Sequence, residues 1–168
     1  ITKFPGMRER TVILDGFSKS YAMTGWRLGY GVFPDFLVEP VVRLMTNSVS
    51  CTSVFSQMAA IAALEGPQDS VGMMMEEFTK RRDLVVAGLN SLPGITCPEP
   101  KGAFYAFPNI KGTGLSSKEF AEKAMYEAGV ALLAGTAFGS FGDGYVRISF
   151  ANSQENLREA IQRLRTIL

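Results

Sequence analysis

The chain has 168 residues, of which 46% are hydrophobic and 20% charged, and its net charge is +1. This length fits one domain, or one domain with part of another, and the hydrophobic content is sufficient to bury a core. The near-neutral charge argues against a nucleic-acid groove or an anionic membrane surface, which both need clustered excess lysine and arginine.

The sequence contains no histidine, which excludes Ser-His and Cys-His nucleophilic schemes and histidine-based metal centres. Its two cysteines, Cys51 and Cys97, are far apart and have no CxxC spacing, so we expect neither a disulfide framework nor a metal site. This cysteine usage predicts a reducing, cytoplasmic setting.

The uncharged stretch 44–64 is too polar for a membrane span. Any catalysis therefore rests on lysine, arginine, tyrosine, carboxylates or a cofactor.

The first half of the chain predicts two short strands and then three helices. The strands are expected at 11–14, as a buried strand that stops at Asp15-Gly16, and at 27–33. The helices are expected at 36–46, from a cap at Thr52 or Ser53 up to Gly66, and over about 69–90. The last helix has an apolar stripe at helical spacing, formed by Val71, Met74, Met75, Phe78, Val85 and Leu89.

The second half changes to short strands, which predict a compact α/β layer with a largely antiparallel sheet. We expect strands at 95–97, 103–107, 130–134 and 145–150. Ser116 and Glu119 form a capping box that starts a helix with Phe120, Ala124 and Met125 facing inward. A final helix is expected from Asn152-Ser153, with an inward face made of Leu157, Ala160, Ile161, Leu164 and Leu168.

The first fifty residues do not predict a domain by themselves, because two strands and one helix cannot close a core. The chain also begins with "ITKFPGMRER", which has the composition of a linker. We therefore expect the whole 168-residue chain to be the C-terminal part of a larger protein.

A lysine in the segment "DGFSKSYAMTGWRLGY" is the first candidate functional residue. Lys19 follows the predicted strand and has Phe17, Tyr21 and Trp26 near it in sequence. We expect these rings to desolvate it partly, which disfavours the ammonium form and exposes a nucleophilic amine able to form a Schiff base with an aldehyde. From these residues alone, a solvated loop lysine is the more common alternative.

Arg27 strengthens the functional interpretation of this segment. It lies eight residues after Lys19, and a planar guanidinium recognises phosphate through two parallel hydrogen bonds. A Schiff-base lysine and a phosphate-binding arginine in one loop suggest a phosphorylated aldehyde, of which pyridoxal 5′-phosphate is the obvious candidate. The hydroxyl of Ser18 is a candidate for a further contact to the phosphate or the lysine, and a plain turn role is the alternative.

The segment "FSKSYAMTGWRLGYGVFP" resembles the lysine segment of the class I and II aminotransferases, which are pyridoxal phosphate enzymes of the aspartate aminotransferase fold (fold type I). The resemblance continues through "SCTSVFSQMAAIAAL", "PKGAFYAFPNI" and "YVRISFANSQENLREAIQRL". It implies that Lys19 bonds covalently to the cofactor and that Arg27 holds its phosphate. It also implies a homodimer that binds amino acid and 2-oxo acid substrates, and no nucleic acid or membrane.

By this resemblance, the α/β chain divides into three parts. Residues 1–50 would hold the last strands of the large cofactor-binding domain, 51–90 the interdomain helices, and 91–168 the small C-terminal α/β domain. The resemblance assigns Arg147 to the substrate's α-carboxylate, and an arginine inside an alternating strand fits an anionic target, although a surface strand position is the alternative. Phe104 is a candidate for lining the site, and core packing is an equal alternative.

The implied reaction is transamination, with Lys19 as general base and then acid. Several groups that the family needs come from sequence before the lysine, so we expect these 168 residues alone to be inactive and to bind the cofactor weakly or not at all. The stretch 46–57 has no basic residue, whereas one family branch reads acidic side chains with a partner-subunit arginine shortly after the cofactor segment. This stretch therefore does not predict aspartate specificity, but other branches use residues that would lie upstream, so aspartate or another amino acid remains open as the substrate. Ser50, Cys51 and Thr52 are weaker candidates for reaching a neighbouring subunit's site, with packing favoured.

Three alternatives remain open at this point. The first is that the protein is another fold type I enzyme, such as a C–S lyase or an amino-acid synthase. The second is that it is a non-catalytic effector-binding domain of aminotransferase-like fold. The third is that it acts only as a folding or interaction module of a split or cleaved protein.

Overall fold

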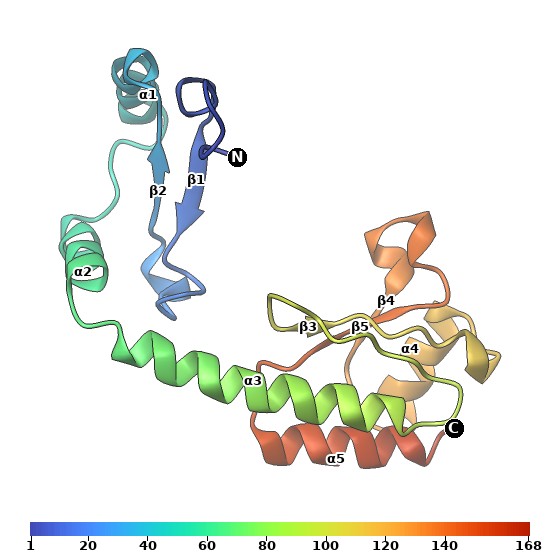
Figure 1. Ribbon diagram of the computed structural model, residues 1–168. Helices are drawn as coiled ribbons and strands as arrows, with labels where there is room; N and C mark the ends of the chain where they lie inside the picture. Colours follow the sequence, from blue (N-terminus) through green and yellow to red (C-terminus); the bar gives the residue numbers. More distant parts are fainter. The chain divides into compact units, whose positions relative to one another are not determined.

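The computed structural model describes all 168 residues, and the chain divides into two compact units, Ile1–Gly72 and Met73–Leu168 (Figure 1). No helix is long and apolar enough to span a membrane. Each unit has its own cluster of buried hydrophobic residues.

The first unit is built on an antiparallel hairpin of β1 (Ile13–Gly16) and β2 (Gly29–Val32), in the register Ile13↔Val32 to Gly16↔Gly29. The predicted strands thus exist with shifted bounds, since β1 continues through the expected stop at Asp15-Gly16. The expectation of a buried first strand is wrong, because Leu14 is 75% exposed. The hairpin has only two strands, so the side chain of Leu14 lies on a face that no other strand of the unit covers.

Two helices follow the hairpin, α1 (Asp35–Ser48) and α2 (Val54–Glu65). As predicted, α2 begins after Ser53 and ends before Gly66, although the Ser53 side chain makes no capping hydrogen bond. The buried cluster of this unit contains Phe17, Met23 and Leu28 from the loop between the strands, packed against alanines of α2: Ala59, Ala60 and Ala63. Small side chains let the loop approach the helix closely.

The second unit contains a three-stranded sheet in the order β3-β5-β4, and its strand pairs are antiparallel, as the sequence predicted. These strands are β3 (Tyr105–Ala106), β4 (Leu133–Ala134) and β5 (Val146–Ser149). The strand expected at 95–97 is reduced to a single bridge between Thr96 and Asn109. Pro98 and Pro100 follow directly, and proline has no N–H to donate to a strand ladder.

Three helices complete this core: α3 (Asp69–Asn90, which starts in the first unit), α4 (Ser117–Tyr126) and α5 (Gln154–Arg165). In Figure 1, α3 and α5 lie side by side. Two hydrogen bonds show that the helices run parallel: Gln154 donates to Glu77 near their N-terminal ends, and Arg165 donates to Ser91 near their C-terminal ends.

The core cluster of the second unit combines side chains from these helices and from one face of the sheet. Three expected core residues are instead exposed: Met75 (61%), Met125 (52%) and Leu168 (38%). Phe120 and Ala124 of the expected α4 stripe are buried, and after α5 it is Ile167 that is buried instead of Leu168.

Candidate active site

The hairpin holds Ser18, Lys19 and Arg27 on one loop, which runs from Phe17 to Leu28. The backbone N–H of Phe17 donates to the carbonyl of Leu28 at 3.3 Å, so the two ends of the loop are fixed together. Lys19 is two residues from one end and Arg27 is one residue from the other. The loop therefore brings the expected amine and guanidinium onto the same closed segment, although the two are eight residues apart in sequence.

Lys19 itself is exposed, so the expectation that aromatic rings partly desolvate it is wrong for this chain. Phe17 packs with other rings instead, with ring centroids 5.5 Å from Tyr21 and 5.5 Å from Tyr30. The carbonyl of Lys19 accepts a hydrogen bond from the N–H of Ala22. This turn holds the lysine backbone and leaves its side chain on the exposed side of the loop.

Arg27 has a left-handed backbone, with φ 52° and ψ 53°, a conformation that is uncommon for residues other than glycine. One N–H of its Nη1 donates to the carbonyl of Thr24 at 3.0 Å. A guanidinium carries five N–H donors in a planar fork, so most of its donors remain available to a ligand. Such strained conformations persist only where surrounding structure enforces them, and they cluster at functional sites.

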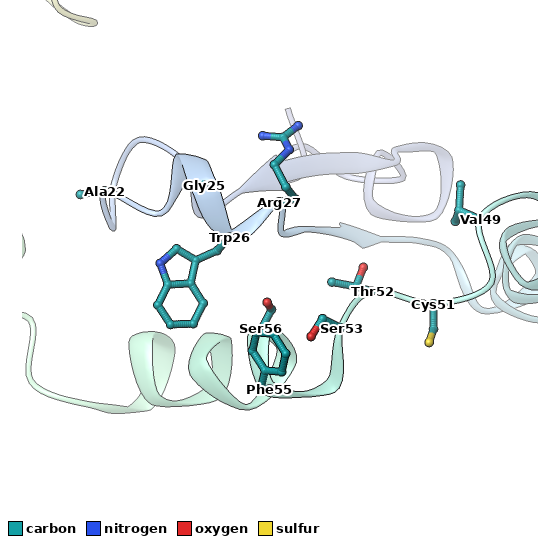
Figure 2. Close-up of a pocket in the computed structure, with 10 residues that line it drawn as sticks. All are labelled: Ala22, Gly25, Trp26, Arg27, Val49, Cys51, Thr52, Ser53, Phe55 and Ser56. Carbon is teal, nitrogen blue, oxygen red and sulfur yellow. The ribbon is translucent and has the colours of Figure 1, made fainter.

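A cleft of about 740 Å³ lies between this loop and the start of α2. Its lining includes Gly25, Arg27 and three hydroxyl residues, Thr52, Ser53 and Ser56 (Figure 2). In Figure 2, Trp26 extends toward α2, whereas the guanidinium of Arg27 points away from that helix. Cys51 and Thr52, the weaker candidates, also line the cleft, and Ser50 beside them has a positive φ of 62°.

Tyr30 is a further titratable group of the hairpin. Its hydroxyl donates to Oδ2 of Asp15 at 3.4 Å, and the negative charge of Asp15 raises the pKa of Tyr30. This pair braces the two strands directly below the loop that carries Lys19.

Arg147 lies in the second unit, on β5, where it is partly buried. Its neighbours Val146 and Ile148 face the core cluster, so the arginine points to the other face of the sheet. No aspartate or glutamate forms an ion pair with it. Its charge is therefore not neutralised within this chain, which suits the expected contact with an anion.

Phe104 packs against the core cluster, with its ring stacked on that of Phe78 at 6.0 Å and tilted against that of Tyr105 at 4.6 Å. This placement fits the core-packing alternative, and a substrate contact of Phe104 stays a prediction. Two residues around Arg147 were not identified from the sequence. The ring centroids of Tyr105 and Phe138 lie 4.3 Å and 4.5 Å from the guanidinium carbon. The alternation of "AFYAF" was a signal for Tyr105, whereas nothing local singles out Phe138.

Similarity to known proteins agrees with these observations. The family model of the class I and II aminotransferases matches residues 4–164. The chain is 48% identical over 170 residues to aromatic-amino-acid aminotransferase 2 of Thermococcus litoralis, covering 100% of this chain and 43% of that protein. It is 46% identical, with the same coverage, to an aspartate aminotransferase of Pyrococcus abyssi.

Solved structures show the same likeness. An aromatic aminotransferase from Pyrococcus horikoshii superposes with a TM-score of 0.92 at 45% identity, covering 98% of this chain and 44% of that one. An aspartate aminotransferase from Rhizobium meliloti gives 0.90 at 39% identity, covering 97% and 43%. The chain thus spans less than half the length of the relatives it matches. Because the family model covers nearly all of the sequence, this chain belongs to the class I and II aminotransferase family, with the fold of type I enzymes.

Proposed function

We propose that these residues form part of a pyridoxal phosphate-dependent aminotransferase, which moves an amino group from an amino acid to a 2-oxo acid. The observation that carries the proposal is the loop Phe17–Leu28, which holds an exposed amine and an arginine fork at its two ends beside a cleft. The family to which the chain belongs, and the printed names of its relatives, support this activity.

The residues of the cleft fit the cofactor's phosphate. Arg27 lines the cleft with Thr52, Ser53 and Ser56, and its guanidinium, which points away from α2 in Figure 2, carries charged in-plane donors on the loop side of the cleft. Charge-assisted hydrogen bonds of this kind are the strongest available for a phosphate. Lys19 supplies the amine for the aldehyde. When bound, the cofactor supplies an electron sink that stabilises negative charge at the substrate's Cα.

The chain's own residues then bind, orient and move a proton. The guanidinium of Arg147 binds the α-carboxylate through two parallel hydrogen bonds, which fixes the direction of the Cα–H bond. The amine of Lys19, once free, removes the proton from Cα and holds it as an ammonium group until it is returned. Proton transfer by a positioned side chain contributes about 10²- to 10⁴-fold to such a rate.

We propose in addition that the protein is a cytoplasmic homodimer. The two cysteines are unpaired, which fits a reducing compartment, and the resemblance to the family supports a dimer with shared sites. The proposed substrates are an amino acid and a 2-oxo acid. The relatives are named for different amino acids, so their names do not select one donor.

The test uses the full-length polypeptide that contains these residues. We expect visible absorbance from bound cofactor in the parent, loss of covalent attachment and of transamination in Lys19→Ala, and weaker cofactor binding in Arg27→Ala. Lys3→Ala and Arg43→Ala are matched controls, since Lys3 is exposed and Arg43 pairs with Glu39 on α1. Product analysis across amino donors separates transamination from lyase or synthase chemistry. A Lys19→Ala variant that transaminates at the parental rate would overturn the proposal.

A further inference from the structure

Arg147 is held by aromatic rings that come from both sides of its strand. Its register partner on β4 is Leu133, and β3 pairs with β5 on the other side through Tyr105↔Ser149. Tyr105 reaches the guanidinium from β3, and Phe138 reaches it from the turn that follows β4. Both distances, 4.3 Å and 4.5 Å, are well within the range of about 6 Å at which a cation interacts with a ring face.

Further contacts fix the position of the Phe138 ring. Phe138 meets the ring of Phe107 edge-on at 6.1 Å, and Phe107 stacks on Tyr145 at 5.5 Å with planes 9° apart. The turn carrying Phe138 is fixed at its start by a 2.8 Å hydrogen bond from the Gly135 N–H to the carbonyl of Tyr145. Gly135 also approaches Gly142 so closely that a Cβ on either would clash with the other's backbone. Phe138 is therefore presented to Arg147 by a turn with little freedom.

These contacts constrain how Arg147 can bind an anion. A ring that covers a guanidinium contacts its face, whereas the five N–H donors lie in its plane. No carboxylate of this chain occupies those donors. Two rings at 4.3 Å and 4.5 Å from the guanidinium carbon restrict its movement, and a bidentate carboxylate requires N–H donors held in a fixed plane.

We propose that Tyr105 and Phe138 are positioning residues for Arg147, and that together they set its selectivity for substrates with an α-carboxylate. The proposal rests on the proposed function of Arg147. Neither ring needs to touch the substrate, because each acts by fixing the guanidinium plane before binding, which reduces the ordering cost on association. Removing one ring frees the side chain to sample other orientations.

The experiment compares an amino acid donor with the amine that lacks only its carboxylate. In the full-length enzyme, single-turnover rates give kcat/KM for both compounds, and their ratio measures carboxylate recognition. We expect Tyr105→Leu and Phe138→Leu each to lower this ratio about five-fold, which corresponds to ~1 kcal/mol at 1.4 kcal/mol per tenfold change. The rate with the amine should stay unchanged, and Tyr105→Phe and Phe138→Tyr should retain the parental ratio because both keep a ring.

Tyr126→Leu is the matched control, since Tyr126 is an 84% exposed tyrosine of the same unit. If the ring variants slow the amine and the amino acid equally, their role is structural and the proposal is overturned. Arg147→Lys distinguishes failure of the positioning role of the rings from failure of the proposed function of Arg147, because an ammonium group cannot replace the planar guanidinium. If Arg147→Lys abolishes the selectivity and the ring variants leave it intact, only the positioning role fails; if Arg147→Lys itself keeps the selectivity, the proposed function of Arg147 fails.

Discussion

Replacing Ser117 by alanine removes a buried hydroxyl that holds the turn before β5. Ser117 is the first residue of α4 and is fully buried. Its Oγ accepts hydrogen bonds from the N–H groups of Gly144 at 2.8 Å and Tyr145 at 3.2 Å. It donates to the carbonyl of Gly142 at 3.2 Å. One side chain thus hydrogen-bonds to three residues of the turn that leads into Val146 and Arg147.

The expected loss of stability follows from these three bonds. A hydrogen bond contributes about 1 kcal/mol net, and a buried donor left without a partner costs about 1–3 kcal/mol. Both N–H groups have second acceptors, since Gly144 also donates to Oδ1 of Asp143 and Tyr145 also donates to the carbonyl of Gly142. These acceptors reduce the penalty, so we expect Ser117→Ala to lower the free energy of unfolding by about 2–3 kcal/mol.

Urea unfolding followed by circular dichroism measures this change, and hydrogen exchange at the amides of Phe120 and Val146 measures it locally, because both residues are 0% exposed. Ser140→Ala is the matched control, as Ser140 is an exposed serine near the same turn and should change stability by about 0.5 kcal/mol or less. If Ser117→Ala behaves like Ser140→Ala in both measurements, the hydroxyl does not hold the turn and the reasoning is refuted.

Two further predictions concern titratable groups. Hydrogen bonds from the Ser116 hydroxyl and N–H lower the pKa of Glu119, so its stabilising contribution is present above its unfolded pKa of about 4.3 and is lost as pH falls through the lower folded pKa. In urea titrations, the stability difference between the parent and Glu119→Gln should therefore shrink from pH 7 to pH 3, and a constant difference would contradict this. Burial raises the pKa of the Cys97 thiol, whereas Cys51 is exposed, so a maleimide at pH 8 should modify Cys51 at least about ten-fold faster by peptide mass spectrometry. Equal rates in the folded chain would show that burial does not protect Cys97.

Local signals predicted the features whose causes lie within a few residues. The capping box is the clearest case: Ser116 and Glu119 exchange hydrogen bonds at the start of α4 as the sequence indicated. The helix expected over about 69–90 from its apolar residues at helical spacing is likewise present as α3, Asp69–Asn90. Asx and Ser/Thr caps, prolines and apolar periodicity act within one or two turns, so a single sequence contains them in full.

Features that depend on strand pairing were not predictable in this way. The position of Phe138 beside Arg147 depends on the pairing of Leu133 with Arg147 and on the turn that follows, which no local pattern encodes. The exposure of Lys19 depends on Phe17 packing under α2 rather than over the lysine. In both cases the residue types indicated the chemistry, and contacts between distant segments decided the geometry.

The two groups of candidate site residues are positioned by the same kind of structure, although they lie in different units. The loop with Lys19 and Arg27 is closed by one backbone hydrogen bond and lies against small alanines of α2. The strand with Arg147 begins at a turn held by Ser117 and flanked by the close approach of Gly135 to Gly142. Neither arrangement uses an ion pair, so the charges of Arg27 and Arg147 are not neutralised by carboxylates of the chain. This state suits the proposed phosphate and carboxylate ligands, because an internal ion pair would have to be broken before either ligand could bind.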